Sequence, residues 1–158
     1  MSVMRRFILT VILTGVMVLF SNAQDYKTGL GLRFGNGAGI TLKHFITDKS
    51  AFEGFLFSKW HGFDITGLYE IHDQAFEEDN LRWFYGFGAH IGFYDGDYVK
   101  WGEPGYAYNV FGVDGIIGIE YSFTEAPINI GIDLKPALNF VEYAGLWVDF
   151  GMSVRYIF

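Results

Sequence analysis

The stretch Leu146–Phe158, LWVDFGMSVRYIF, alternates between two kinds of side chain along its whole length. One parity holds only apolar and aromatic residues, and these are Leu146, Val148, Phe150, Met152, Val154, Tyr156 and Phe158. The other parity holds Trp147, Asp149, Gly151, Ser153, Arg155 and Ile157. Because successive side chains of a β-strand point to opposite faces, this alternation predicts a strand that lies between two different environments.

The same period of two runs through the rest of the chain after its first two dozen residues. The expected strands span residues 26–34, 39–46, 51–60, 63–72, 81–94, 111–123, 128–140 and 146–158. In the last four of them, one face has 28 positions without a charge, and the opposite face has 25 positions of which seven are charged. Pro136 lies on the uncharged face, where we expect a bulge or a loss of pairing.

Most glycines of these strands lie on the charged face. An eight-stranded barrel has an interior that is just wide enough for side chains to fill, so the glycine-rich face suits the inside. The apolar face then lies outside, as in a membrane barrel, where only a closed sheet leaves no unpaired backbone groups in lipid. The sequence therefore predicts an all-β fold, a closed eight-stranded antiparallel up-and-down transmembrane β-barrel with a polar interior.

The charged residues of the inward parity are expected to form a lumenal charge network, because a narrow lumen disfavours isolated ions. Its predicted members are Arg33, Lys43, Glu53, Asp64, Glu70, Arg82, Asp114, Glu120, Asp133, Lys135, Asp149 and Arg155. If Phe140 lies opposite Leu146, two diagonal ion pairs follow. These are Lys135–Asp149 and Asp133–Arg155.

The N-terminus has the pattern of a secretory signal peptide over residues 1–23. Arg5 and Arg6 precede the apolar run Phe7–Phe20, and Ser21-Asn22-Ala23 resembles a cleavage site. Residues 24–158 then form a single domain with 9 Lys and Arg against 18 Asp and Glu. This acidic balance argues against nucleic acid as a partner. The chain has no Cys, which excludes disulfides and thiolate chemistry.

The residues Val154, Tyr156 and Phe158 resemble the C-terminal assembly signal of outer-membrane barrels. The chain as a whole resembles the small eight-stranded barrels of the outer-membrane protein A and X type, and the stretches 43–45, 66–70 and 86–92 resemble an uncharacterised group within that class. The resemblance implies insertion into the outer membrane of a Gram-negative bacterium by the barrel assembly machinery, with periplasmic chaperones. Outer-membrane lipids, including lipopolysaccharide, are then partners. An even strand number places both termini in the periplasm.

The expected role is structural, envelope-stabilising or surface-binding, and not enzymatic. We predict no catalytic residue, cofactor or metal. One alternative is an enzyme that modifies lipid A, for which His44 and Ser58 are the candidate outward pair. A second is a narrow channel for ions or small solutes, although Phe84, Tyr94 and Trp147 are expected to help plug the lumen. The sequence does not identify a partner for the external loops. The acidic and aromatic loop 95–109 is where we expect one to bind, through Tyr98, Trp101, Tyr106 and Tyr108.

Overall fold

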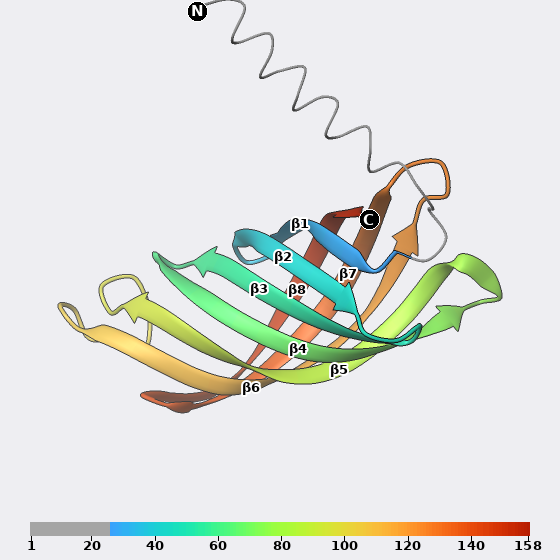
Figure 1. The fold of residues 1–158 in the computed structure, drawn as a ribbon. Helices are drawn as coiled ribbons and strands as arrows, with labels where there is room; N and C mark the ends of the chain where they lie inside the picture. The colour runs from blue at the N-terminus through green and yellow to red at the C-terminus, as the bar shows by residue number, and fades with distance from the viewer. Residues whose placement is uncertain (1–25) are drawn as a thin grey trace, which may run out of the picture.

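The computed structural model describes residues 26–158, so the expected signal peptide lies outside the described residues. Eight strands form over this range (Figure 1). They are β1 (Thr28–Phe34), β2 (Ala38–Phe45), β3 (Ser50–Lys59), β4 (Gly62–Ala75), β5 (Glu78–Asp95), β6 (Ala107–Ser122), β7 (Ile128–Val141) and β8 (Tyr143–Ile157). Each of the eight predicted segments corresponds to one of these strands.

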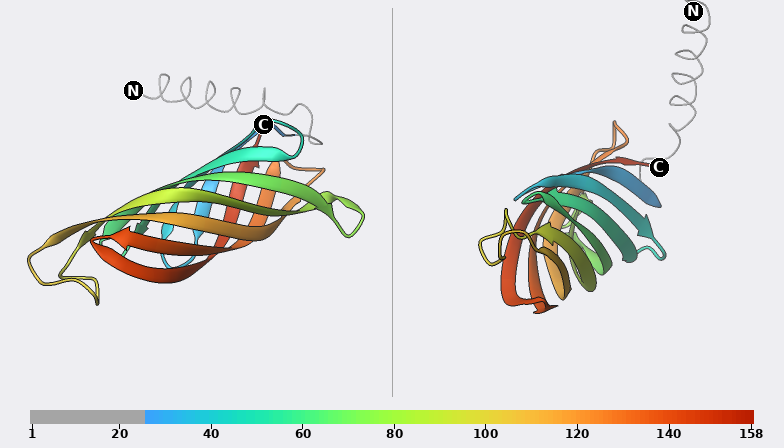
Figure 2. Two further views of the ribbon diagram at one scale, coloured as in Figure 1. Left: turned by 90° about the horizontal axis from the view of Figure 1, so that it is seen from below. Right: turned by 90° about the vertical axis from the view of Figure 1, so that its left-hand side faces the viewer.

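The sheet closes on itself. Each strand pairs antiparallel with the next, and β1 also pairs with β8. Thr28 and Phe158 exchange two backbone hydrogen bonds of 2.9 Å at this seam. The predicted fold class, a closed eight-stranded antiparallel barrel, is therefore confirmed (Figure 2). Among residues 26–158, no helix is long and apolar enough to cross a membrane.

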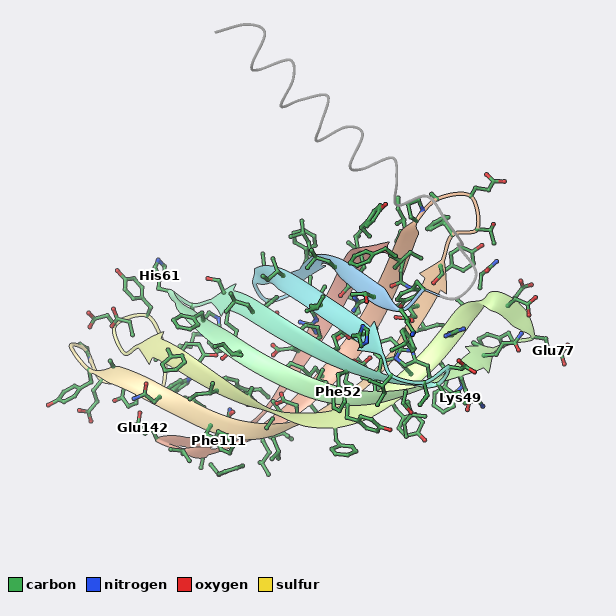
Figure 3. All side chains as sticks on the ribbon, in the orientation of Figure 1. Lys49, Phe52, His61, Glu77, Phe111 and Glu142 are labelled. Carbon is green, nitrogen blue, oxygen red and sulfur yellow. The ribbon has the colours of Figure 1, made fainter. Side chains whose placement is uncertain are left out.

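The barrel has two ends that differ in their connections. We call the end with Thr28 and Ile157 the proximal end, and the other the distal end. Lys49 and Glu77 lie at the proximal end, where the β4–β5 hairpin projects, and His61 and Glu142 lie at the distal end (Figure 3). The longest connection, residues 96–106, joins β5 to β6 at the distal end.

The alternation of polarity follows the strands as predicted, with the apolar side chains outside. Leu30 and Leu134 are 50% and 47% exposed on the outer wall, whereas Arg33 and Arg155 are 2% and 1% exposed inside. A water-soluble barrel would place its apolar side chains in the interior. In this barrel the interior is largely ionic and the outer wall is largely hydrocarbon.

Two connections are shorter than the expected ones. The connection between the expected strands 63–72 and 81–94 is a two-residue turn, because β4 and β5 extend to Ala75 and Glu78. Its residues Phe76 and Glu77 have φ values of 53° and 61°, the left-handed geometry of tight hairpin turns. The predicted loop 95–109 is shorter, since β6 begins at Ala107.

The register between β7 and β8 differs by two residues from the predicted one. Phe140 lies opposite Ala144, and Leu146 lies opposite Leu138. The cause is the turn at Glu142, whose φ of 57° lets the strands reverse more tightly than the five-residue loop we expected. The prediction that Phe140 lies opposite Leu146 is therefore wrong.

The expected disturbance at Pro136 is present. The β6–β7 pairing breaks between the Asp114–Ala137 and Ile117–Leu134 pairs. Pro136 has no backbone N–H to donate to this ladder. A Cβ at Gly115 would lie 3.3 Å from the Pro136 ring, so the absence of a side chain at Gly115 makes room for that ring.

Candidate functional site

The interior holds nearly all of the predicted lumenal charge network. Eleven of the twelve residues are buried, and the remaining one, Arg82, is half-buried at the proximal mouth. There its guanidinium lies 5.7 Å from the Phe45 ring centroid and 3.5 Å from the backbone oxygen of Asp48. These residues therefore lie inside the barrel or at its mouth, but the ion pairs among them differ from the predicted ones.

A first group of ions, the proximal ionic cluster, consists of Lys43, Glu53, Glu70, Glu120, Arg155 and His72. The Lys43 ammonium lies 3.2, 2.9 and 3.0 Å from carboxylate oxygens of Glu53, Glu70 and Glu120. Arg155 pairs with Glu53 and lies 3.8 Å from Glu120. These side chains come from β2, β3, β4, β6 and β8, so the cluster connects strands on different sides of the barrel.

His72 belongs to this cluster, although it was not among the predicted members of the lumenal network. Its ring nitrogens lie 3.1 Å from Glu70 and 3.4 Å from Glu120, and its ring stacks on Phe84 at 5.1 Å between centroids. The side chain is fully buried. Its inward parity, continuous with Asp64 and Glu70, is the sequence signal that identifies it.

Tyr26 also contacts this cluster, although it was not among the predicted members of the lumenal network. It precedes β1, and its hydroxyl donates a hydrogen bond of 3.0 Å to Glu120 at the proximal mouth. Burial and the nearby Glu120 carboxylate raise the pKa of the Tyr26 hydroxyl well above its ordinary value.

An apolar layer made of Phe55, Leu68, Phe84 and Ile116 fills another part of the lumen. The Lys43 ammonium lies 4.2 Å from the Phe84 ring centroid, and the Arg33 guanidinium lies 4.8 Å from the Phe55 ring centroid. Arg33 also pairs with Asp133. The aromatic rings therefore pack against the buried cations.

A second group, the distal ionic cluster, consists of Lys59, Asp64, His90, Asp114, Lys135 and Asp149. Lys59 lies 3.1 Å from Asp64 and 3.4 Å from Asp149. Asp114 accepts from Lys135 at 2.6 Å and lies 2.8 Å from His90. Lys59 was absent from the predicted network, although it continues the inward parity of Glu53.

The two predicted diagonal ion pairs are wrong. Lys135 bonds to Asp114, and Asp149 pairs with Lys59. Asp133 pairs with Arg33, and Arg155 pairs with Glu53. The register of β7 and β8 differs from the predicted one, so the predicted neighbours are displaced. The actual partners of these four residues lie on β1, β3 and β6, and the closed sheet brings them together inside the barrel.

Four aromatic residues form a cover at the distal mouth, which we call the aromatic lid: Trp60, Tyr94, Trp101 and Trp147. The Lys59 ammonium lies 5.0 Å from the Trp60 ring and 4.8 Å from the Trp147 ring. The Tyr94 hydroxyl donates to Asp64. Trp147 contacts Trp60 edge-on at 5.2 Å between ring centroids. The lid therefore packs directly on the distal ionic cluster.

The four aromatic residues predicted for a partner loop separate into two pairs. Tyr98 and Tyr106 are 54% and 63% exposed. Trp101 and Tyr108 are half-buried, and their ring centroids lie 5.2 Å apart. Trp101 also packs against Tyr94. The Tyr98 ring stacks on His61 at 4.0 Å between centroids, which joins the loop to the β3–β4 turn.

On the outer wall, the candidate pair His44 and Ser58 is not brought together. His44 lies opposite Phe52, and Ser58 lies six residues further along β3, opposite Ala38. His44 Nδ1 lies 2.9 Å from the Thr28 hydroxyl. The three residues of the expected assembly signal keep the outward parity, with Val154 38% and Phe158 50% exposed and Tyr156 half-buried.

Among residues 26–158, no group of three or more His, Asp or Glu side chains is arranged to hold a metal ion. No family model matches the chain, and neither a curated protein nor a solved structure matches it.

Proposed function

We propose that the protein is an integral outer-membrane barrel of a Gram-negative bacterium, with a structural, envelope-stabilising or surface-binding role and no enzymatic activity. The observation that carries the proposal is the polarity of the barrel. Large apolar side chains such as Phe52, Phe87 and Phe150 are 55%, 68% and 55% exposed around a closed sheet, while charged residues lie inside. Exposed hydrocarbon on this scale is stabilised by lipid and not by water.

The side chains in the lumen favour a barrel that does not conduct ions, and they disfavour the channel alternative. The proximal ionic cluster, the apolar layer at Phe84 and the aromatic lid follow one another along the interior. Ions that cross would have to displace paired charges that are almost completely buried. The barrel then acts as a rigid membrane anchor whose connections meet the two aqueous compartments.

The surface-binding part of the proposal rests on the distal connections. With the proximal end in the periplasm, the loop 96–106 and the Trp60–His61 turn face the outside of the cell. Exposed Tyr98 and Tyr106, beside the acidic residues Asp97 and Glu103, offer aromatic contact area for a partner. This position makes the distal loop the first surface to test for an interaction.

The location is tested by fractionating cells that produce the full chain and by comparing unheated with boiled samples on detergent gels. We expect the protein in the outer-membrane fraction, detergent-dependent in solution, and with a gel shift on boiling that reports the folded barrel. A protein that stays dissolved without detergent would overturn the proposal. Mass spectrometry of lipid A from the same cells is expected to show no change, whereas a lost or added acyl chain would favour the enzyme alternative.

A further inference from the structure

The outer wall carries a shallow groove of about 530 Å³ that crosses strands β2 to β5. Gly54 on β3 lies directly opposite Gly67 on β4, and these two residues form its floor. The adjacent row of outward side chains, Phe52, Tyr69 and Phe87, forms one wall. Figure 3 labels Phe52, which marks the position of the groove on the outer wall. The groove is therefore a hollow in the apolar belt of the outer wall.

Close packing does not explain the two glycines of the floor. A Cβ at Gly67 would have no heavy atom within 4 Å, and a Cβ at Gly54 would have only the Thr66 oxygen at 3.9 Å. By contrast, a Cβ at the inward-facing Gly31 or Gly39 would lie 2.0 or 2.2 Å from a backbone oxygen. Glycine inside a strand weakens the sheet. The open floor thus carries a cost that the fold itself does not require.

Besides the Tyr69 hydroxyl, the groove has one outward polar side chain, His44. This residue lines the groove next to Leu42 and lies at the end of β2 that meets the proximal rim. Its Nδ1 is 2.9 Å from the Thr28 hydroxyl. With the Thr28 hydroxyl donating, the ring proton lies on Nε2, where it can be donated outward. In this tautomer, the groove combines an apolar length with a hydrogen-bond donor near one end.

Resting on the proposed membrane location, we propose that this groove binds one glycerophospholipid. One acyl chain lies over Gly54 and Gly67, and a phosphate or ester oxygen of the same lipid accepts the hydrogen bond from His44. A flexible chain with acceptor oxygens at one end matches this arrangement of polarity. A second copy of the barrel would present a convex wall, which is a poorer match to the floor than a flexible acyl chain.

The probe for the test is palmitoyl-oleoyl phosphatidylethanolamine, added to the delipidated full chain in detergent and counted by native mass spectrometry. We expect one probe molecule to remain bound to the wild type. The double variant G54V/G67V fills the floor and is expected to lower the affinity by about tenfold or more, equivalent to about 1.4 kcal/mol. H44F keeps the wall but removes the donor, and it is expected to weaken binding as well. The control A144V adds the same side chain to an exposed outer position on β8, and it should bind like the wild type.

Equal probe binding by the wild type and G54V/G67V would overturn the proposal. So would a dimer that dissociates in G54V/G67V, because the groove would then be an interface between two copies. All variants are first checked for the gel shift on boiling and for outer-membrane location. Failure of the wild type in those checks contradicts the proposed function, whereas a folded outer-membrane protein with unaltered lipid binding contradicts only the groove.

Discussion

Arg33 on β1 forms an ion pair with Asp133 on β7, and it reaches this partner across the intervening strand β8 at Gly151. A Cβ at Gly151 would lie 2.2 to 2.6 Å from the guanidinium atoms of Arg33. Both partners are about 2% exposed. Gly151 therefore provides the space in which a buried cation meets a carboxylate two strands away.

We predict that Gly151→Val destabilises the barrel by about 3–5 kcal/mol, because the new side chain displaces Arg33 and leaves Asp133 buried without its partner. Urea unfolding in detergent, followed by tryptophan fluorescence and by the gel shift on boiling, measures the change. Gly67→Val is the matched control on the outer face. With no atom near its Cβ, it is expected not to destabilise the barrel, because glycine inside a strand is itself unfavourable. A similar loss of unfolding free energy in both variants would show that the barrel does not depend on the space that Gly151 leaves for Arg33.

The proximal ionic cluster gives a second prediction, on Lys43. Lys43→Met removes the cation that contacts Glu53, Glu70 and Glu120, and it leaves three buried carboxylates with reduced compensation. The expected loss of unfolding free energy is about 3–5 kcal/mol. The double variant K43M/E70Q should recover part of that loss, since it removes one carboxylate as well.

The control for Lys43 is Lys49, which pairs with Asp73 at 2.6 Å on the surface of the proximal end. The two side chains are 67% and 46% exposed, so water screens their attraction. Lys49→Met is expected to change stability by less than about 1 kcal/mol. If Lys43→Met cost as little as Lys49→Met, the buried cluster would not contribute to holding the strands together.

The strands and their inward faces could be predicted from the sequence because the period of two depends only on neighbouring residues. Asp149 and Arg155 alternate with Val148 and Phe150 in the same strand, so their burial follows from local order alone. The break opposite Pro136 could be predicted for a similar reason, since a residue without a backbone N–H disturbs any ladder.

The ion pairs could not be predicted, because they depend on closure and on register. Arg155 reaches Glu53 from β8 to β3, and no local pattern encodes a distance across the cylinder. The register of β7 and β8 depends on a left-handed conformation at Glu142, a residue type that does not signal one. Lys59 and His72 also have the inward parity of their strands, yet neither was among the predicted members of the network.

Tyr26 gives a prediction on alkaline stability, from a position that precedes the first strand. Its pKa is raised by burial and by Glu120, so the folded state retains the phenol proton more strongly than the unfolded chain does. The stability from this group is complete below about pH 10, the ordinary tyrosine value, and is lost as the pH rises further. Tyr26→Phe removes the hydrogen bond to Glu120 and is expected to cost about 1.5–3 kcal/mol at neutral pH.

Unfolding free energies of the wild type and Tyr26→Phe, measured from neutral to alkaline pH, test this expectation. The other tyrosines and lysines titrate in both proteins, so their contribution cancels in the difference. We expect the advantage of the wild type to shrink above about pH 10. Parallel curves over the whole range would mean that the Tyr26 proton is not coupled to folding.

The aromatic lid gives the last prediction, which concerns conduction. Trp147→Ala removes the ring that contacts both Trp60 and the Lys59 ammonium, so the distal mouth should become more open to water. The apolar layer at Phe84 and the proximal ionic cluster remain, and both lie within the same lumen. In planar bilayers we therefore expect no steady conductance from the wild type or from Trp147→Ala. Hydrogen exchange at the distal ends of β3 and β8 should nevertheless rise in the variant, because these ends lose their cover. Steady openings in Trp147→Ala alone would show that the lid is the barrier, and would make a gated channel the better account of this barrel.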